Sequence, residues 1–144
     1  MLIKQLSIFV ENKPGRLVTV IDELANNHID ISALSIADTA EYGIVRMIVS
    51  NPDLAVAVLM EIGVFVKITD VIAVTIDDTP GGLAKSLQAI THEGVEIEYM
   101  YAFVGNMEGK AVMILKVSHP EKAVELLKET SVEVLKARDV YRIH

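Results

Sequence analysis

The sequence contains two copies of one segment, and this repeat constrains the fold more than any other feature. Residues 8–17 (Ile-Phe-Val-Glu-Asn-Lys-Pro-Gly-Arg-Leu) recur at residues 74–83 (Val-Thr-Ile-Asp-Asp-Thr-Pro-Gly-Gly-Leu). Self-similarity at a fixed spacing marks a repeated structural unit, so the chain divides into two units of about 70 residues. A unit of that size buries only about 60% of its unfolded surface and is marginally stable alone. We therefore expect the units to pack against each other or against a second chain.

Hydrophobic periodicity predicts the same order of elements in both units. Leu6, Ile8 and Val10 alternate with polar positions as in a half-buried strand. After it, Pro14 fits the first turn of a helix, where its missing N–H costs nothing. The first unit is predicted to continue with this helix to Asn26-Asn27, strands at 29–37 and 44–49, a helix opened by Asn51-Pro52 and stopped by Gly63, and a short strand at 64–68.

The second unit repeats this pattern from Ile72 onward. Its predicted elements are a strand through Ile72, Val74 and Ile76, a helix through Leu83, Leu87 and Ile90, strands at 95–104 and 111–117, a helix opened by His119-Pro120, and closing strands at 132–135 and 139–143. Each unit is thus strand-helix-strand-strand-helix-strand. Right-handed crossovers then give an α+β fold, an antiparallel sheet with both helices on one face and with the first and third strands central. We expect domains at 1–69 and 70–144, with only Thr69-Asp70 as a polar break.

The second strand of each unit is apolar on both faces. In the first unit Leu34 and Ile36 alternate with Ala33 and Ala37, and in the second Met100 and Ala102 alternate with aromatic residues. Stray surface hydrophobes would explain this pattern. The sharper interpretation is that the other unit covers these edge strands, because an exposed apolar edge invites aggregation.

Composition excludes several classes of function. The formal net charge is -7 and no basic run is present, so the cationic footprint that nucleic-acid binding needs is missing. The absence of cysteine removes disulfides, thiolate nucleophiles and sulfur metal ligands. No apolar run approaches the roughly 20 residues of a membrane span, and no signal segment opens the chain. We expect a cytoplasmic protein that binds no membrane.

The two Pro-Gly loops each join a strand to a helix N-terminus. Backbone N–H groups of a first helical turn have no intrahelical partner, and the helix dipole favours an anion there. Gly15 and Gly81 let a ligand approach the backbone. Just upstream, Asn12 both donates and accepts hydrogen bonds, whereas ionised Asp78 only accepts. An amino acid presents a carboxylate and an ammonium together and fits such a loop. The plainer interpretation is that Pro-Gly only turns the chain.

With these loops on this six-element pattern, the chain resembles ACT domains in tandem, over residues 3–68 and 71–143. The resemblance implies a ferredoxin-like fold for each unit and regulatory binding of amino acids or similar small molecules. It also implies that sites form between domains, where the loop after one first strand faces the second strand of its neighbour. Carried over by position, the ligand-binding residues would be Asn12, Pro14, Gly15 and Arg16 in one site and Asp78, Pro80, Gly81 and Gly82 in the other. Asp78 in place of an amide gives the two sites different ligand chemistry. If only one loop binds, we expect the loop that follows Asn12.

We expect no catalytic residue, metal ligand or cofactor. His28, His92 and His119 fall at helix ends, and Glu96 and Glu98 share a solvated strand face. His92 and Glu96 have the spacing of a helical metal pair, but Gly94 ends the helix between them. The predicted function is an amino-acid sensor, a homodimer, able to regulate a metabolic enzyme in trans. Two alternatives stay open, which are an interaction subunit without a ligand and a small enzyme with an unrecognised site.

Overall fold

The first strand shows how the alternating pattern builds the structure. In the computed structural model, which describes residues 2–11, 13–38, 41–77, 79–103 and 110–141, β1 spans Ile3–Glu11. Leu6, Ile8 and Val10 are buried in a hydrophobic core, as predicted, while Phe9 on the opposite face is exposed. Burial of three such side chains stabilises the fold by roughly 1.5–3 kcal/mol each.

The described residues form two compact units. One comprises residues 4–69, and the other comprises residues 70–141 together with Leu2 and Ile3. Strand β4 (Phe65–Asp77) runs through the boundary, so its first residues belong to one unit and its last residues to the other. The sequence predicted a short strand at 64–68 and a polar break at Thr69-Asp70. Instead both residues lie within one continuous strand.

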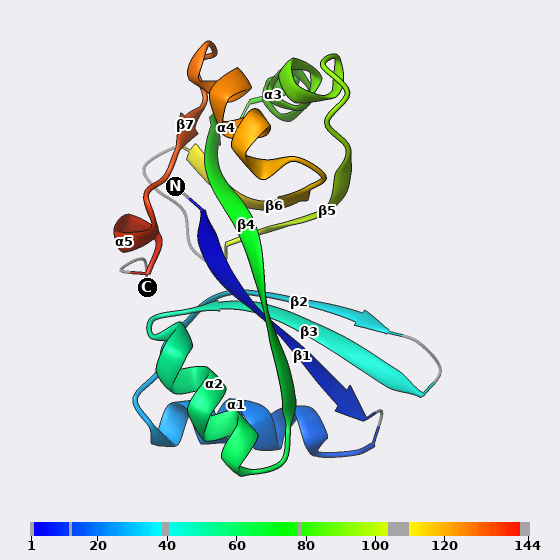
Figure 1. Ribbon diagram of the computed structural model, residues 1–144, viewed down its shortest axis with the longest axis vertical. Coiled ribbons are helices and arrows are strands. Elements are labelled where there is room, and N and C mark those ends of the chain that lie inside the picture. The colour runs from blue at the N-terminus through cyan, green and yellow to red at the C-terminus, as the bar shows by residue number, and fades with distance from the viewer. Residues whose placement is uncertain (1, 12, 39–40, 78, 104–109, 142–144) are drawn as a thin grey trace. The chain divides into compact units, whose positions relative to one another are not determined.

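The first unit has the predicted strand order, β2-β3-β1-β4, with the first and third strands central. Strands β2 (Ile31–Asp38), β3 (Tyr42–Val49) and β1 pair antiparallel, with Ile8 opposite Val45 and Ile36 opposite the same residue on the other side. Helices α1 (Arg16–Asn26) and α2 (Pro52–Glu61) cover one face of this sheet (Figure 1). Their buried residues join the core of β1 and β3, and these are Val20, Leu24, Ala55, Val58 and Leu59.

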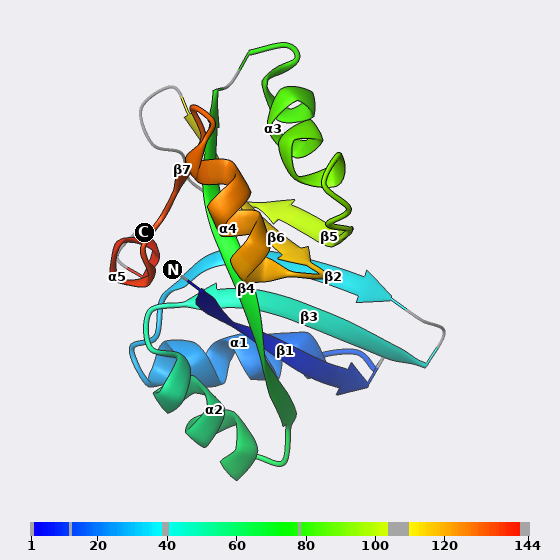
Figure 2. The ribbon, with the colours of Figure 1, turned by 45° about the horizontal axis from the view of Figure 1, so that its top comes forward.

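The second unit has the same order, β7-β4-β6-β5. Its sheet is built from β4, β5 (Ile97–Ala102), β6 (Lys110–Val117) and the short β7 (Glu133–Val134). Helices α3 (Gly82–Thr91) and α4 (Pro120–Lys128) pack on it, as Figure 2 shows. The core contains Ile72, Val74, Ile76, Ile90 and Leu127. Both units are therefore ferredoxin-like, as predicted, and the fold is α+β.

Two predictions about element ends are wrong. Pro14 was expected in the first helical turn, but α1 begins at Arg16 because Gly15 is left-handed (φ 82°) and cannot be helical. Helix α3 likewise begins at Gly82, after left-handed Gly81 (φ 85°), and contains Leu83, Leu87 and Ile90 as predicted. The predicted last strand at 139–143 is also absent over its described part. Short helix α5 (Ala137–Val140) takes its place, after Leu135 N–H has paired with the Ala73 carbonyl of β4.

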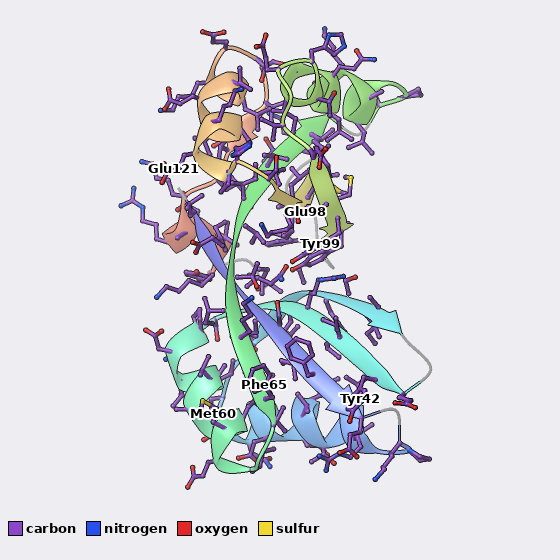
Figure 3. All side chains as sticks on the ribbon, turned by 45° about the vertical axis from the view of Figure 1, so that its right-hand side comes forward. Tyr42, Met60, Phe65, Glu98, Tyr99 and Glu121 are labelled. Atoms are coloured by element: carbon purple, nitrogen blue, oxygen red, sulfur yellow. The ribbon has the colours of Figure 1, made fainter. Side chains whose placement is uncertain are left out.

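Large apolar side chains are exposed on the first unit. Phe65 is 66% exposed, and its ring lies 5.2 Å from that of Phe9 on the sheet face opposite the helices. Tyr42 and Met60 are also more than half exposed (Figure 3). In the second unit, by contrast, Ala73 and Ile114 on the corresponding sheet face are fully buried. The prediction that the other unit covers the second strands stays a prediction.

Candidate functional site

The two Pro-Gly loops have the same backbone structure. Lys13 N–H donates to the Glu11 carbonyl at 2.8 Å, and Thr79 N–H donates to the Asp77 carbonyl at the same distance. Each helix then starts with the same bond, from Thr19 N–H to the Gly15 carbonyl (3.0 Å) and from Lys85 N–H to the Gly81 carbonyl (3.1 Å). The repeat therefore preserves a strand–turn–helix geometry as well as a sequence.

The glycines in these loops have two different reasons to be glycine. Gly15 and Gly81 have positive φ, and a Cβ added to either would meet nothing within 4 Å. Glycine is therefore favoured at these two positions by the left-handed backbone and not by lack of space. Gly82 has no such φ, but a Cβ there would lie 2.5 Å from the Asp77 carbonyl oxygen. The first unit has Arg16 at the matching position, so the loops differ in side-chain room next to the helix start.

The first helical turns offer hydrogen-bond donors. Because the first helical bonds are made by Thr19 and Lys85, the N–H groups of Leu17, Val18, Leu83 and Ala84 have no acceptor inside their helices. Neither α1 nor α3 has a side-chain N-cap, and neither has an acidic residue in its first turn. An anionic group of a ligand could therefore bind at either helix start.

The charges around the two loops differ. In the first, the Lys13 ammonium lies 3.0 Å from the Glu11 carboxylate. The hydrogen bond and charge of Lys13 lower the pKa of Glu11, with a smaller contribution from Arg16. In the second loop Asp77 is the acidic residue that corresponds to Glu11. Thr79 and Gly82, which are uncharged, stand at the positions of Lys13 and Arg16. The ion pair of the first loop thus has no counterpart in the second.

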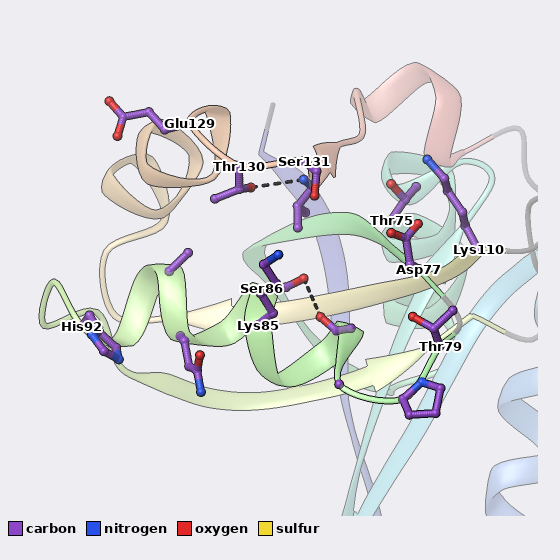
Figure 4. A pocket seen from close by; sticks show the side chains of 16 residues that line it. Thr75, Asp77, Thr79, Lys85, Ser86, His92, Lys110, Glu129, Thr130 and Ser131 are labelled. Carbon is purple, nitrogen blue, oxygen red and sulfur yellow. Dashed lines mark hydrogen bonds between the residues drawn. The ribbon is translucent and has the colours of Figure 1, made fainter.

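A groove of about 860 Å³ adjoins the second loop. It is bounded by the loop at Pro80–Gly82, by α3, by the last residues of β4 and by residues 129–132 between α4 and β7 (Figure 4). The hollow beside Arg16 in the first unit measures only about 100 Å³. Of the predicted site residues that the structure describes, Pro80, Gly81 and Gly82 line the larger groove, Arg16 lines the smaller one, and Pro14 and Gly15 line neither.

Sequence reasoning missed most of the polar groups in the larger groove. Thr75 is 4% exposed, and its hydroxyl has no hydrogen-bond partner among the residues that the structure describes. Lys85, Lys110 and Asp77 also line the groove, and none of them has an ion-pair partner in the described ranges. The signal available in the sequence was the position of Thr75, a polar residue within the apolar run from Val71 to Ile76.

The remaining sequence candidates stay apart. Asn12 and Asp78, on which the predicted difference between the loops rests, lie outside the described residues, as does His144. His28, His92 and His119 are exposed at helix ends or N-caps, and His92 also lines the groove. Glu98 forms an ion pair with Lys116 at 3.0 Å.

Metal clusters and membrane-spanning helices are both absent from the described part of the chain. It holds no cluster of three or more His, Cys, Asp or Glu side chains with the arrangement of a metal site. None of its helices combines the length and hydropathy that crossing a membrane requires.

Comparisons with known proteins extend over the whole chain. The sequence model of the ACT domain pair matches residues 1–144. The crystal structure of protein BT0572 from Bacteroides thetaiotaomicron is 45% identical, with a TM-score of 0.93, covering 99% of this chain and 97% of that one. No curated protein matches.

More distant structures share the fold. The regulatory subunit of aspartate kinase from Thermus thermophilus is 19% identical with a TM-score of 0.63, covering 88% of this chain and 91% of that one. The corresponding subunit from Thermus flavus is 19% identical with a TM-score of 0.58, covering 88% and 90%. Taken with the duplicated strand–turn–helix loops, the full-length family match establishes that this chain belongs to the ACT domain family, as a pair of ACT domains.

Proposed function

We propose that this ACT domain pair is a non-catalytic regulatory protein that binds an amino acid at its Pro-Gly loops. The observation that carries the proposal is the duplicated helix start, where unpaired N–H groups can receive a carboxylate. Asp77 in the second loop and Glu11 in the first supply a carboxylate for the ligand's ammonium. The other residues proposed to bind are those named from the sequence, in domains at 1–69 and 70–144, with the ligand held at a domain interface.

Regulation would follow from linkage. A ligand that prefers one arrangement of the protein stabilises it, and a partner that prefers the same arrangement then binds more tightly. The structures of aspartate kinase regulatory subunits show that chains of this fold and length occur as separate regulatory subunits. For this chain, we propose a metabolic enzyme as the partner regulated in trans.

Calorimetric titration with each of the twenty amino acids, together with thermal unfolding at millimolar ligand, tests the proposal. A ligand present at 100 times its Kd stabilises the folded state by about 2.7 kcal/mol, which a melting curve resolves. Heat release and a raised Tm with one class of amino acid are expected. Absence of both with all twenty would refute amino-acid binding.

A ligand-free interaction subunit is the second candidate, and the exposed apolar residues of the first unit favour it. Phe9 and Phe65 form an exposed aromatic pair, which is unusual on a surface without a partner. We propose that this face serves a homodimer. Sedimentation of Phe65→Glu against wild type tests the dimer, with Met60→Glu as an exposed apolar control on α2. A monomeric Phe65→Glu beside a dimeric control supports the proposal, and two unchanged dimers contradict it.

Variants of the loops separate the two candidates. Gly15→Leu and Gly81→Leu place a bulky side chain at a left-handed position. Loss of the ligand response with assembly intact supports the sensor. Retained response in both variants contradicts binding at these loops.

A further inference from the structure

The groove beside the second loop contains polar and charged side chains that the Pro-Gly turn itself does not need. One wall is the start of α3, where the N–H groups of Leu83 and Ala84 have no helical acceptor. By itself, a helix start is common to most helices and identifies no ligand. The other wall is formed by the end of β4, and there the side chains are specific.

Thr75 is the first of these side chains. It lies on β4, paired in register with Val112, and it is 4% exposed. Its hydroxyl has no partner among the described residues, and Thr75 is one of the residues that line the groove. No fully buried side-chain nitrogen or oxygen of the described residues lacks a hydrogen-bond partner, so the Thr75 hydroxyl is open to the groove. A ligand group in the groove can therefore exchange a hydrogen bond with it.

Two lysines provide positive charge in the same groove. Lys85 rises from the first turn of α3 and points into the space below Ser131, while Lys110 at the start of β6 extends alongside Asp77 and Thr75 (Figure 4). Asp77 and Lys110 are also register partners across β4 and β6. The Glu129 carboxylate, although at the rim, points away from the groove.

The groove therefore pairs one carboxylate with two ammonium groups and several hydroxyl donors. A neutral zwitterion would use Asp77 for its ammonium and the helix start for its carboxylate, and would leave both lysines without an anionic partner. A second carboxylate on the ligand provides that partner. Charge-assisted hydrogen bonds of this kind are about twice as strong as neutral ones.

We infer that the second domain binds an acidic amino acid, glutamate or aspartate, in this groove. Asp77 receives the ammonium, the start of α3 receives the α-carboxylate, and Lys85, Lys110 and Thr75 select the side-chain carboxylate. This assignment rests on the proposed amino-acid binding and names its ligand class and its selecting residues. It also assigns the site to the second loop and to a groove whose described lining residues all belong to the second domain, whereas the sequence favoured the loop that follows Asn12 and a site between domains.

The test compares matched ligands and matched variants by calorimetry on the full chain. L-Glutamate against L-glutamine, and L-aspartate against L-asparagine, differ only in the second carboxylate. We expect each acid to bind at least tenfold more tightly than its amide. Lys85→Gln and Lys110→Gln should weaken the acids about tenfold and leave the amides nearly unchanged. Lys136→Gln, an exposed lysine outside the groove, is the control.

Thr75 is tested with two variants. Thr75→Val removes the hydroxyl while it keeps the shape, and Thr75→Ser keeps the hydroxyl. We expect weaker binding of glutamate only in Thr75→Val, with thermal unfolding of the free proteins showing that both fold.

The outcomes distinguish this inference from the proposed function. If amides or apolar amino acids bind as well as the acids, the assignment to acidic ligands is wrong while amino-acid binding stands. If acids bind but the groove variants change nothing and Gly15→Leu abolishes binding, the site is the first loop. If no amino acid binds, the proposed function and this inference both fail.

Discussion

His28 holds the same left-handed backbone position in the first unit that Gly94 holds in the second. Their φ angles are 56° and 85°, and His28 is the one described residue other than glycine with positive φ. The hydrogen bonds match too. Ile29 N–H donates to the Leu24 carbonyl at 3.0 Å, and Val95 N–H donates to the Ile90 carbonyl at 3.3 Å. Both helices thus end in the same turn, which glycine enters without steric cost.

The first prediction follows from this pair. His28→Gly should raise the free energy of unfolding by about 1 kcal/mol, because glycine relieves the left-handed strain at His28. The reciprocal change, Gly94→His, should lower the free energy by a similar amount. Chemical denaturation measures both variants. If both variants were equally destabilised, the left-handed backbone conformation would not explain a preference for glycine at these two positions.

The second prediction concerns the room beside the second loop. Gly82→Ala places a Cβ 2.5 Å from the Asp77 carbonyl oxygen, so the turn must shift. We expect a loss of roughly 1–3 kcal/mol in the free energy of unfolding, as for other overpacked sites. Arg16→Ala is the matched control, because the first unit already has a Cβ at this position. A Gly82→Ala variant as stable as wild type would contradict the geometry.

The third prediction uses the two helix starts at prolines. The Asn51 side chain accepts a hydrogen bond from Leu54 N–H at 3.2 Å and caps α2, whereas His119 at the start of α4 makes no such bond. Asn51→Ala should cost about 1 kcal/mol of stability, and His119→Asn should gain up to a similar amount. Thermal unfolding of both variants measures these changes in stability. If Asn51→Ala and His119→Ala behave alike, the Asn51 cap contributes nothing.

The fourth prediction is a titration. The hydrogen bond and charge of Lys13 hold the pKa of Glu11 below its ordinary value, so Lys13→Gln should raise it. Arg16→Gln should raise it less, because its charge is the smaller contribution. NMR titration of the Glu11 carboxyl carbon measures the shift. The stability that Glu11 contributes is present above the ordinary carboxyl pKa and is lost as pH falls through the lowered one. High salt should reduce the effect, since the pair is exposed.

The sequence predicted the fold well because the repeat supplied each element twice. Alternation placed Leu6 and Ile8 in one core and Ile72 and Val74 in the other. Errors arose where backbone conformation outweighed composition. Pro14 fits a first helical turn, but left-handed Gly15 delays the start of α1 to Arg16.

The site was less accessible to sequence reasoning. Pro-Gly marks the loop, but nothing in the chain order relates Lys85, Lys110 and residues 129–132, which the fold brings to one groove. Thr75 could have been singled out as a hydroxyl inside a buried strand. Its relevance to a ligand depends on its position on the groove, which only the three-dimensional structure shows.

The assignment of Leu2 and Ile3 to the unit built from residues 70–141 has an evolutionary consequence. Leu2 packs against that unit's core, although the chain continues from there into the other unit. A gene split between codons 69 and 70 would therefore produce a second fragment that lacks two residues of its own structure. Keeping both units in one reading frame therefore keeps Leu2 and Ile3 with the unit to which they belong.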